Sequence, residues 1–388
     1  MKQSLPALDK MLTATLFVFV ASSMFSISVT QIASGLGGLL WIIRTYLTNT
    51  WSEQRWPLRV PFLLFILACL IAVGNAYDVS YSFESLKKLL EILIFFWVVN
   101  CVRENRLRDS LSLVLIISAS LAGLLGFYQA WEGGVTFLNR VEGTMSVYMT
   151  FAGLLMMVGV HAWGRVLIRK PTQSWLWISV GIISICLIFT FTRQAWLGYL
   201  IGLMLLLYFW KKIYILFIPM LIAVLIMISP YGVKHRLSDM ISGKDETFAM
   251  RKALWQGGWN VFKDYSLTGC GFRCMDLVLT QYPDPTGYIK RFRGMHNNFV
   301  QLAVDTGVLG LSAWLGIWIC FFRSLYQRIS AQEETSPEQW VLWGSFASAI
   351  AFLAGGFFES NYYDSEVAMV LFFLMALPFS GSQSKKSI

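Results

Sequence analysis

The stretch SLSLVLIISASLAGLLGFYQAW, residues 110–131, decides the fold class because its 22 residues include no Asp, Glu, Lys or Arg. A helix of this length extends about 33 Å, which is enough to cross roughly 30 Å of hydrocarbon. Similar apolar runs recur along the 388-residue chain, and 56% hydrophobic residues with a mean hydropathy of +0.59 exclude an ordinary soluble composition. We therefore expect an all-α polytopic membrane protein with about twelve transmembrane helices, at residues 11–28, 30–46, 59–76, 86–102, 110–131, 145–163, 175–192, 194–210, 213–229, 298–321, 340–358 and 365–380.

Basic residues indicate the orientation of these spans, because Lys and Arg concentrate in cytoplasmic loops. With the N-terminus inside, the cytoplasmic segments contain 17 basic residues, whereas the short outer loops contain at most four: Arg140, Arg193, Lys87 and Lys88. We therefore expect both termini in the cytoplasm, with the first apolar segment kept as an uncleaved span. The net charge of +9 follows from this bias, so it gives no reason to expect a nucleic-acid partner.

One long outer loop divides the chain. We expect helices 1–9 in residues 1–229, the loop in residues 230–297, and helices 10–12 with a cytoplasmic tail in residues 298–388. Within the loop, ETFAMRKALWQGGWNVFKD predicts an amphipathic helix with Arg251, Trp255, Gly258 and Phe262 on one face. Tryptophans on such a face predict that the helix rests on membrane lipids or on the outer mouth of the bundle.

Two of the six cysteines, Cys270 and Cys274, share this outer loop. A disulfide between them is one option, and two unpaired thiols are the option that we expect. Neither these nor the other cysteines have zinc-ligand spacing with histidines nearby.

Three ionisable residues are expected at the outer ends of spans. They are Arg193 in FTFTRQAWLGYL, Arg251 in the amphipathic helix, and His296 in RGMHNNFVQLAVDTGVLG. Singly, an arginine in this position usually extends to lipid headgroups, and a histidine usually caps a helix. Together, two guanidiniums suit a diphosphate, and an imidazole suits removal of a proton from a hydroxyl. The combination therefore predicts group transfer from a pyrophosphate to an alcohol.

A metal ion is the usual alternative for stabilising a leaving diphosphate, and it is commonly held by an Asp-x-Asp pair. No such pair occurs on the expected outer face. The nearest arrangement is Asp364 and Glu366 in YYDSEV, at the edge of a span. We therefore expect arginines to supply the positive charge, with no metal or other cofactor.

Three stretches resemble the O-antigen ligase family, which shares a core with O-antigen polymerases and bacterial O-oligosaccharyltransferases. They are TRQAWLGYL, RKALWQGGWNVFKDYSLTGCGF and HNNFVQLAVDTGVLG, in the family's order around a large outer loop. The last is the most specific, although Asp305 stands where the family commonly has glutamate. Arg140, in NRVEGTMS, resembles a weaker family feature whose following asparagine is absent.

The resemblance implies a metal-independent, inverting glycosyltransferase of the GT-C type at the periplasmic face of the bacterial inner membrane. Such ligases move an O-polysaccharide from undecaprenyl pyrophosphate to a sugar hydroxyl of lipid A–core in lipopolysaccharide biosynthesis. On this sequence, His296 would be the general base, and Arg193, Arg251 and Arg140 would bind the pyrophosphate. Asn297, Asn298 and Gln301 would either bind sugars and orient the imidazole or simply cap the tenth helix.

Three other functions stay open on the sequence. A polysaccharide polymerase would use the same donor, and these motifs do not separate it from a ligase. A protein O-oligosaccharyltransferase fits less well, because that group resembles longer chains. A lipid or sugar transporter would be expected to carry charges buried within its spans and paired inverted repeats. The expected spans are instead nearly free of ionisable residues, and Glu91 is the main exception.

Overall fold

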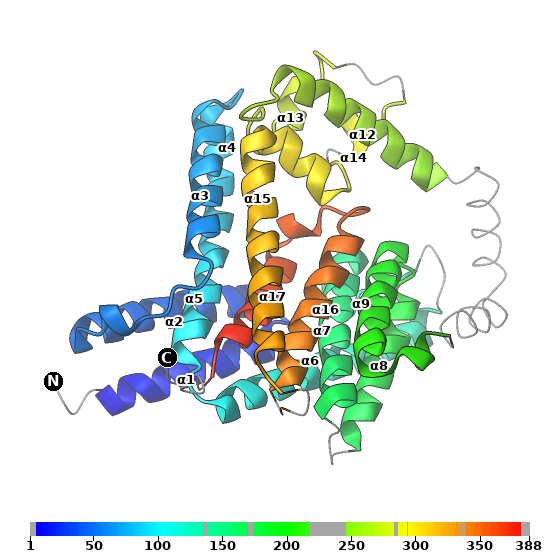
Figure 1. The fold of residues 1–388 in the computed structure, drawn as a ribbon. Helices are drawn as coiled ribbons and strands as arrows, with labels where there is room; N and C mark the ends of the chain where they lie inside the picture. The colour runs from blue at the N-terminus through cyan, green and yellow to red at the C-terminus, as the bar shows by residue number, and fades with distance from the viewer. Residues whose placement is uncertain are drawn as a thin grey trace.

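The computed structural model describes residues 5–134, 139–169, 174–216, 246–282, 286–292, 294–333, 336 and 338–381. Within these ranges every regular element is a helix, as the sequence predicts (Figure 1). Most of the expected ninth span, at 213–229, lies outside the described residues. The same holds for positions 230–245 of the long loop and for Arg293.

Six described segments are long and apolar enough to cross a bilayer. They are α1 (Leu5–Ser22), α2 (Ile27–Thr48), α6 (Asn105–Gly133), α7 (Tyr148–Arg169), the segment Arg193–Ile215, which contains α9 (Arg193–Lys211), and α15 (Asn298–Ser330). Shorter apolar helices are α3 (Arg59–Gly74), α8 (Trp175–Phe189), α16 (Gln339–Gly355) and the segment Ser365–Phe379, which contains α17 (Ser365–Ala376). The chain is thus a polytopic membrane protein by length and composition, and the total of twelve spans stays a prediction.

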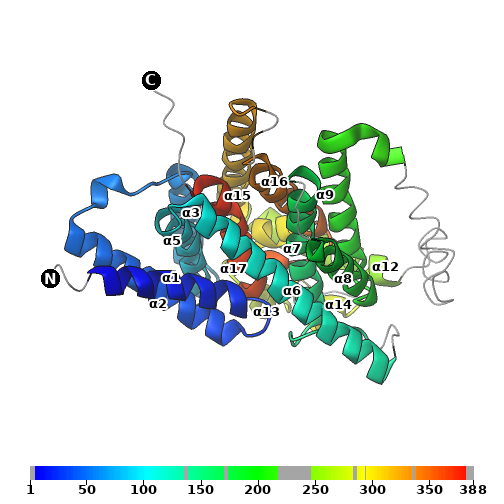
Figure 2. The same ribbon diagram turned by 90° about the horizontal axis from the view of Figure 1, so that it is seen from below.

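The helices form two packed groups. In one, α16 packs against α7 and α9, and α8 packs against α6 and α7. In the other, α3 packs along α15, α1 pairs with α2, and α17 packs on α5 (Ile92–Cys101), which follows α4 (Val79–Phe83) and the 3-10 helix Glu84–Glu91. Figure 2 shows α6 passing from one group to the other, and α6 contacts both α1 and α8.

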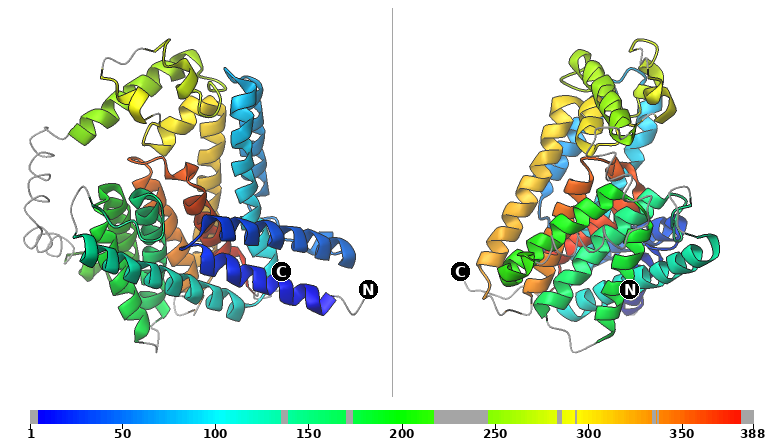
Figure 3. Two further views of the ribbon diagram at one scale, coloured as in Figure 1. Left: turned by 180° about the vertical axis from the view of Figure 1, so that it is seen from behind. Right: turned by 90° about the vertical axis from the view of Figure 1, so that its right-hand side faces the viewer.

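Two ends of the first group matter for function. We use "site end" for the end of α7, α9 and α16 that holds Tyr148, Arg193 and Gly355, and "opposite end" for the other. Helices α12 (Glu246–Asp264), α13 (Met275–Val278) and α14 (Tyr288–Phe292) gather beyond the site end (Figure 3). The long loop therefore folds over this end of the bundle.

Helix α12 is the amphipathic helix that the sequence predicts, and its buried face packs on α14 and α15. Gly258 on this face lies so close to α15 that an added Cβ would come within 2.6 Å of Met295 Sδ and 3.0 Å of Val300 Cγ1. Arg251 is only 9% exposed. Of the two expected positions, the structure therefore places this face on the mouth of the bundle.

Helix α15 is not the straight tenth span that the sequence predicts at 298–321. The backbone leaves the helical region at Gly307, with φ 63° and ψ −166°, a conformation that essentially only glycine adopts. A short first part carries Asn298 up to this break, and the long apolar part follows it. His296 therefore precedes a short helix folded over the bundle, instead of opening the long span directly.

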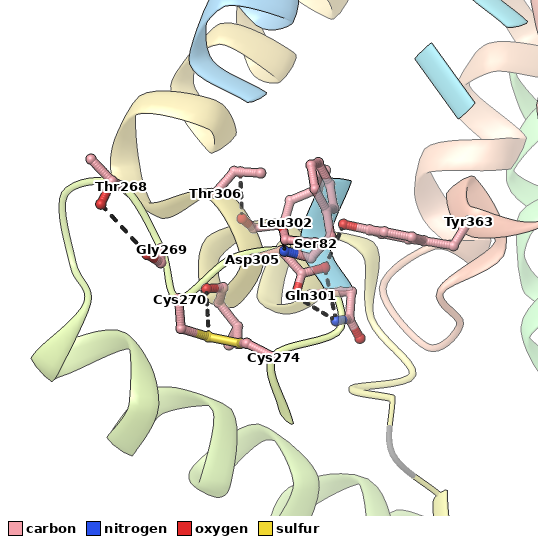
Figure 4. Close-up of a disulfide and its surroundings, with 12 residues drawn as sticks. Ser82, Thr268, Gly269, Cys270, Cys274, Gln301, Leu302, Asp305, Thr306 and Tyr363 are labelled. Carbon is pink, nitrogen blue, oxygen red and sulfur yellow. Dashed lines mark hydrogen bonds between the residues drawn. A yellow bond between two sulfur atoms is a disulfide. The ribbon is translucent and has the colours of Figure 1, made fainter. Parts of the chain in front are cut away.

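The segment after α12 binds this break through its backbone. Cys270 N donates to Val304 O at 3.0 Å, and Gly271 N donates to Asp305 O at 3.1 Å. Cys270 and Cys274 form a disulfide beside it, with their Cα atoms 5.7 Å apart (Figure 4). The expectation of two unpaired thiols is therefore wrong. Both sulfurs lie in a small apolar core that the loop builds around α12, and this core brings the two side chains together.

Candidate functional site

His296 lies in a tight backbone turn directly before α15. Its φ of 44° is left-handed, and the neighbouring residue holds the turn on both sides: Met295 N donates to Gln301 Oε1 at 2.9 Å, and Met295 O accepts from Trp255 Nε1 at 2.9 Å. The imidazole Nδ1 lies 3.0 Å from Glu359 Oε1, and 17% of the side chain stays exposed. The histidine is thus fixed in position yet open to a ligand.

Glu359 belongs to a turn that follows α16, which we call the 357–360 turn (Phe357, Phe358, Glu359 and Ser360). Its Oε1 also accepts from Ser360 N at 3.1 Å, and its Oε2 accepts from Gln194 Nε2 at 3.3 Å. Gln194 is in the first turn of α9, next to Arg193. One carboxylate therefore connects the turn that bears the histidine with the helix start that bears the first arginine.

Arg193 is the first residue of α9 and is partly buried. A cation at a helix N-terminus opposes the helix dipole, so helix stability does not explain its presence there. The same N-terminus presents backbone N–H groups that favour an anion. The local electrostatics therefore suit a negatively charged ligand at this position.

Arg251 reaches the same turn from α12. Its guanidinium carbon lies 5.9 Å from the centre of the Phe358 ring, and the ring of Trp255 lies 6.1 Å from the same phenylalanine. Phe358 directly precedes Glu359, so the second arginine and the histidine meet on adjacent residues of the 357–360 turn. The structure thus brings together His296, Arg193 and Arg251 from three elements that are distant in sequence.

Arg140 is also at the site end, before the start of α7. Its guanidinium carbon lies 4.3 Å from the centre of the Tyr148 ring. It lines a cavity of about 380 Å³ together with residues from the end of α6, among them Gln129 and Glu132, and with Glu142. The described contacts connect Arg251, and Gln194 beside Arg193, to the 357–360 turn, and they place Arg140 at this separate cavity.

The three amides singled out by sequence make hydrogen bonds within the protein. Asn297 caps α15, its Oδ1 accepting from the backbone N–H groups of Phe299 at 2.8 Å and Val300 at 3.0 Å. Asn298 donates to Asn361 Oδ1 at 2.9 Å. Gln301 holds Met295, as described above. The capping alternative thus describes Asn297, and all three amides support the turn that carries His296.

Asp305, which stands where the family commonly has glutamate, is fully buried behind this turn. It accepts from Gln301 Nε2 at 3.1 Å on each oxygen, and from the Tyr363 hydroxyl at 2.8 Å (Figure 4). Because Gln301 in turn binds Met295 N, the carboxylate acts on the backbone next to His296. Its contacts make it part of the support for the histidine.

Other carboxylates at the site end stand near the start of α17. Burial raises the pKa of Asp364 to about 6, and a hydrogen bond from Thr150 Oγ1, 2.9 Å away, offsets part of that rise. Glu366 lies in the first turn of α17. Among the residues that the structure describes, no three His, Cys, Asp or Glu side chains are grouped so that they could hold a metal ion.

Sequence reasoning missed Glu359 and Gln194. The sequence shows Asp364 and Glu366 as acidic residues at the edge of an expected span. Glu359 in FFESNYY likewise lies at the edge of one, directly after an apolar run. An ionisable residue at that depth was the available signal. What the sequence lacked was the partner, because 63 positions separate Glu359 from His296.

A comparison with protein families matches residues 178–315 to the family described as O-antigen ligase. The matched segment begins in α8 and ends in α15, so it includes Arg193, Arg251 and His296 but neither Arg140 nor Glu359. A comparison with curated proteins gives no match.

Proposed function

The chain belongs to the O-antigen ligase family through residues 178–315, and on this premise we propose that it transfers O-polysaccharide from undecaprenyl pyrophosphate to a sugar hydroxyl of lipid A–core. One observation carries the proposal: His296, Arg251 and the residue next to Arg193 all contact the 357–360 turn. A base and two cations at one place suit a reaction in which a hydroxyl loses a proton while a diphosphate leaves.

The reaction is a single displacement at the anomeric carbon of the first sugar. His296 takes the proton of the acceptor hydroxyl, whose oxygen forms the new bond to that carbon. The bond between the carbon and the pyrophosphate oxygen breaks, and undecaprenyl pyrophosphate leaves with the electron pair. Attack opposite the leaving group inverts the configuration. The arginines offset the charge that develops on the diphosphate, so no nucleotide is required.

The position of the site also suits the substrates. Donor and acceptor each have a lipid part that stays in the bilayer and a sugar part that stays in water, so transfer must occur near the level of the headgroups. We place this site at the periplasmic face of the inner membrane, with both termini in the cytoplasm, as the basic residues predict. Helix α12 and the kinked α15 would then cover the reacting groups from the periplasmic side.

A deletion strain tests the proposal against its nearest relative, a polymerase that uses the same donor. For a ligase, lipopolysaccharide loses all core-attached polymer while lipid-linked polymer accumulates, and the gene restores the ladder of bands on a gel. A strain that instead attaches a single repeat to its core would show that the chain is a polymerase. An unchanged profile would contradict both functions.

A further inference from the structure

We propose that Glu359 is the positioning residue of this site: it holds His296 in the tautomer that can accept a proton and ties it to the start of α9, next to Arg193. This inference rests on the proposed function, and it assigns a role to a residue that lies outside the matched segment. Glu359 is expected to act through the histidine without touching either substrate.

The first step is the tautomer. A carboxylate oxygen can only accept, and Glu359 Oε1 lies 3.0 Å from His296 Nδ1. The ring proton is therefore on Nδ1, which leaves the Nε2 lone pair as the position that takes a proton. If the ring were bound in the other tautomer, Nε2 would carry a hydrogen and could not act as the base.

The second step is charge. When the base takes its proton, the ring becomes a cation, and a carboxylate in contact with it favours that form. Side-chain exposure of Glu359 is only 12%, so water screens this interaction weakly. Other charged groups at this end include Arg193 on α9, Arg251 on α12 and Arg140 before α7. They also include Glu366 in α17 and Asp364 just before it, and Glu359 helps to raise the pKa of Asp364. The Glu359 carboxylate is in direct contact with the ring.

The third step is position. Both carboxylate oxygens are engaged, Oε1 by Ser360 N at 3.1 Å and Oε2 by Gln194 Nε2 at 3.3 Å, so the group has little freedom to rotate. The base thus keeps a fixed separation from the helix that carries Arg193. Bond formation occurs at the base and bond breaking at the diphosphate, and small errors in their separation cost large factors in rate.

The test is Glu359→Gln, which keeps the shape of the side chain and removes its charge. We expect the rate of transfer in membranes, with saturating donor, to fall at least about 100-fold, while the donor concentration for half-maximal rate changes only a few-fold. We also expect the acid limb of the activity-against-pH profile to move to lower pH, because removing the negative charge favours the uncharged, active ring. Loss of a merely structural contact would reduce the rate without moving this limb.

Glu338→Gln is the matched control, because Glu338 and Glu359 flank α16 at its two ends. Glu338 also contacts a cationic side chain, with Arg108 Nη1 at 2.6 Å. This variant should keep both the rate and the pH profile. Gln194→Ala removes only the link to α9 and should lower the rate while leaving the acid limb in place.

Glu359→Asp keeps the charge on a shorter side chain and guards against a variant that fails to fold. It should lose rate yet retain the wild-type acid limb. Glu359→Gln with a rate within about threefold of wild type, or with an unmoved acid limb, would overturn the inference. Failure of the proposed function would look different, because the wild-type membranes themselves would then transfer no glycan to lipid A–core.

Discussion

The two ends of α16 use the same residue types for opposite purposes. At the opposite end, His161 is fully buried, with its Nε2 3.0 Å from the Ser112 hydroxyl and its ring 5.4 Å from that of Trp340. At the site end, His296 is partly exposed and its partner is the carboxylate of Glu359. A hydroxyl leaves a protonated imidazole uncompensated, whereas a carboxylate stabilises it. The two histidines therefore differ in the burial of the ring and in the group that contacts it.

The arginines differ in the same way. Arg108 is 3% exposed and its charge is met by Glu338 and Asp109, while Arg165 lies 4.5 Å above the Trp340 ring. These charges are neutralised and packed within the protein. At the site end, Arg193 and Arg251 flank a turn that also holds a partly exposed histidine. The buried charges thus stabilise helix packing at the opposite end, and we infer that those at the site end bind a substrate.

The largest expected effect separates the two histidines. We expect His296→Ala to reduce transfer by at least about 100-fold with little change in the amount of membrane protein, because only proton removal is lost. His161→Ala should leave the transfer rate per folded molecule within about threefold of wild type and lower the melting temperature, since it empties a buried site. The measurement is transfer in membranes, normalised to the folded protein.

His296→Asn is the control for folding. Asparagine tolerates the left-handed backbone of this position better than alanine does, so it should fold and still be inactive. Substantial transfer by either His296 variant would remove the general base from the proposal. Equal loss in the His296 and His161 variants would erase the distinction between the two ends.

The next effect concerns the shape of the cation. A lysine keeps the charge but cannot form the planar two-bond contact with phosphate oxygens. We expect Arg193→Lys and Arg251→Lys each to lower the transfer rate about 10- to 150-fold, which corresponds to losing roughly 1.5–3 kcal/mol in the transition state. Arg165→Lys at the opposite end should stay near wild type, because its cation packs on Trp340 and donates to Asp109 O at 3.3 Å, away from the proposed site.

The alternative for these arginines is contact with lipid headgroups, which a lysine would satisfy equally well. Near-normal transfer by both lysine variants, at matched expression, would mean that Arg193 and Arg251 anchor the protein in the bilayer. The proposal would then lose its account of the leaving group. A loss of transfer in only one variant would mean that only that arginine binds the diphosphate.

The sequence was sufficient for the parts of this molecule that depend on local pattern. The lengths of apolar runs predicted helices, and α12 covers the segment in which the amphipathic pattern predicts one. The same pattern did not reveal the break in α15, because a glycine within a predicted span does not by itself indicate that the helix breaks there. The break depends on the approach of the distant 266–271 segment, where Val308 N donates to Ser266 O at 2.8 Å.

The same distinction between local pattern and distant contacts applies to the site. Residues with unusual chemistry for their position, His296, Arg193 and Arg251, could be proposed from sequence because ionisable groups are rare beside membrane spans. Glu359 could not be paired with the histidine, since the pairing depends on how α16 ends relative to α15. Asp305 is noted in the sequence only as standing where the family commonly has glutamate, and its burial and its contacts with Gln301 and Tyr363 show a structural role.

A smaller effect tests whether the carboxylates of the two ends differ as the histidines do. Burial raises the pKa of Asp364 from its ordinary value of 3.8 to about 6 in the folded protein. The folded state therefore binds this proton more tightly, so its stabilising contribution is present at low pH and is lost as the pH rises from about 4 to about 6. Above that range the buried charge costs up to roughly 3 kcal/mol.

Asp364→Asn should therefore raise the melting temperature of the purified protein at pH 8 by a few degrees and have little effect at pH 4. Thr150 can still donate to the amide oxygen, so the local hydrogen bond persists. Asp109→Asn at the opposite end should do the reverse and destabilise the protein at pH 8, because Asp109 pairs with both Arg108 and Arg169. Equal destabilisation by both variants would contradict this difference between the ends.

The last prediction is that chelation of metal ions leaves the transfer rate unchanged. The site end also holds Asp364 and Glu366, the acidic pair that could serve as metal ligands if the arginines do not supply the positive charge. Because two guanidiniums already offset the charge of a diphosphate, we expect transfer by purified protein to survive EDTA and to need no added nucleotide. If Mg²⁺ or Mn²⁺ stimulates the chelated enzyme, and Asp364→Asn removes that stimulation, the charge on the leaving group is met by metal and the roles of Arg193 and Arg251 must be reassigned.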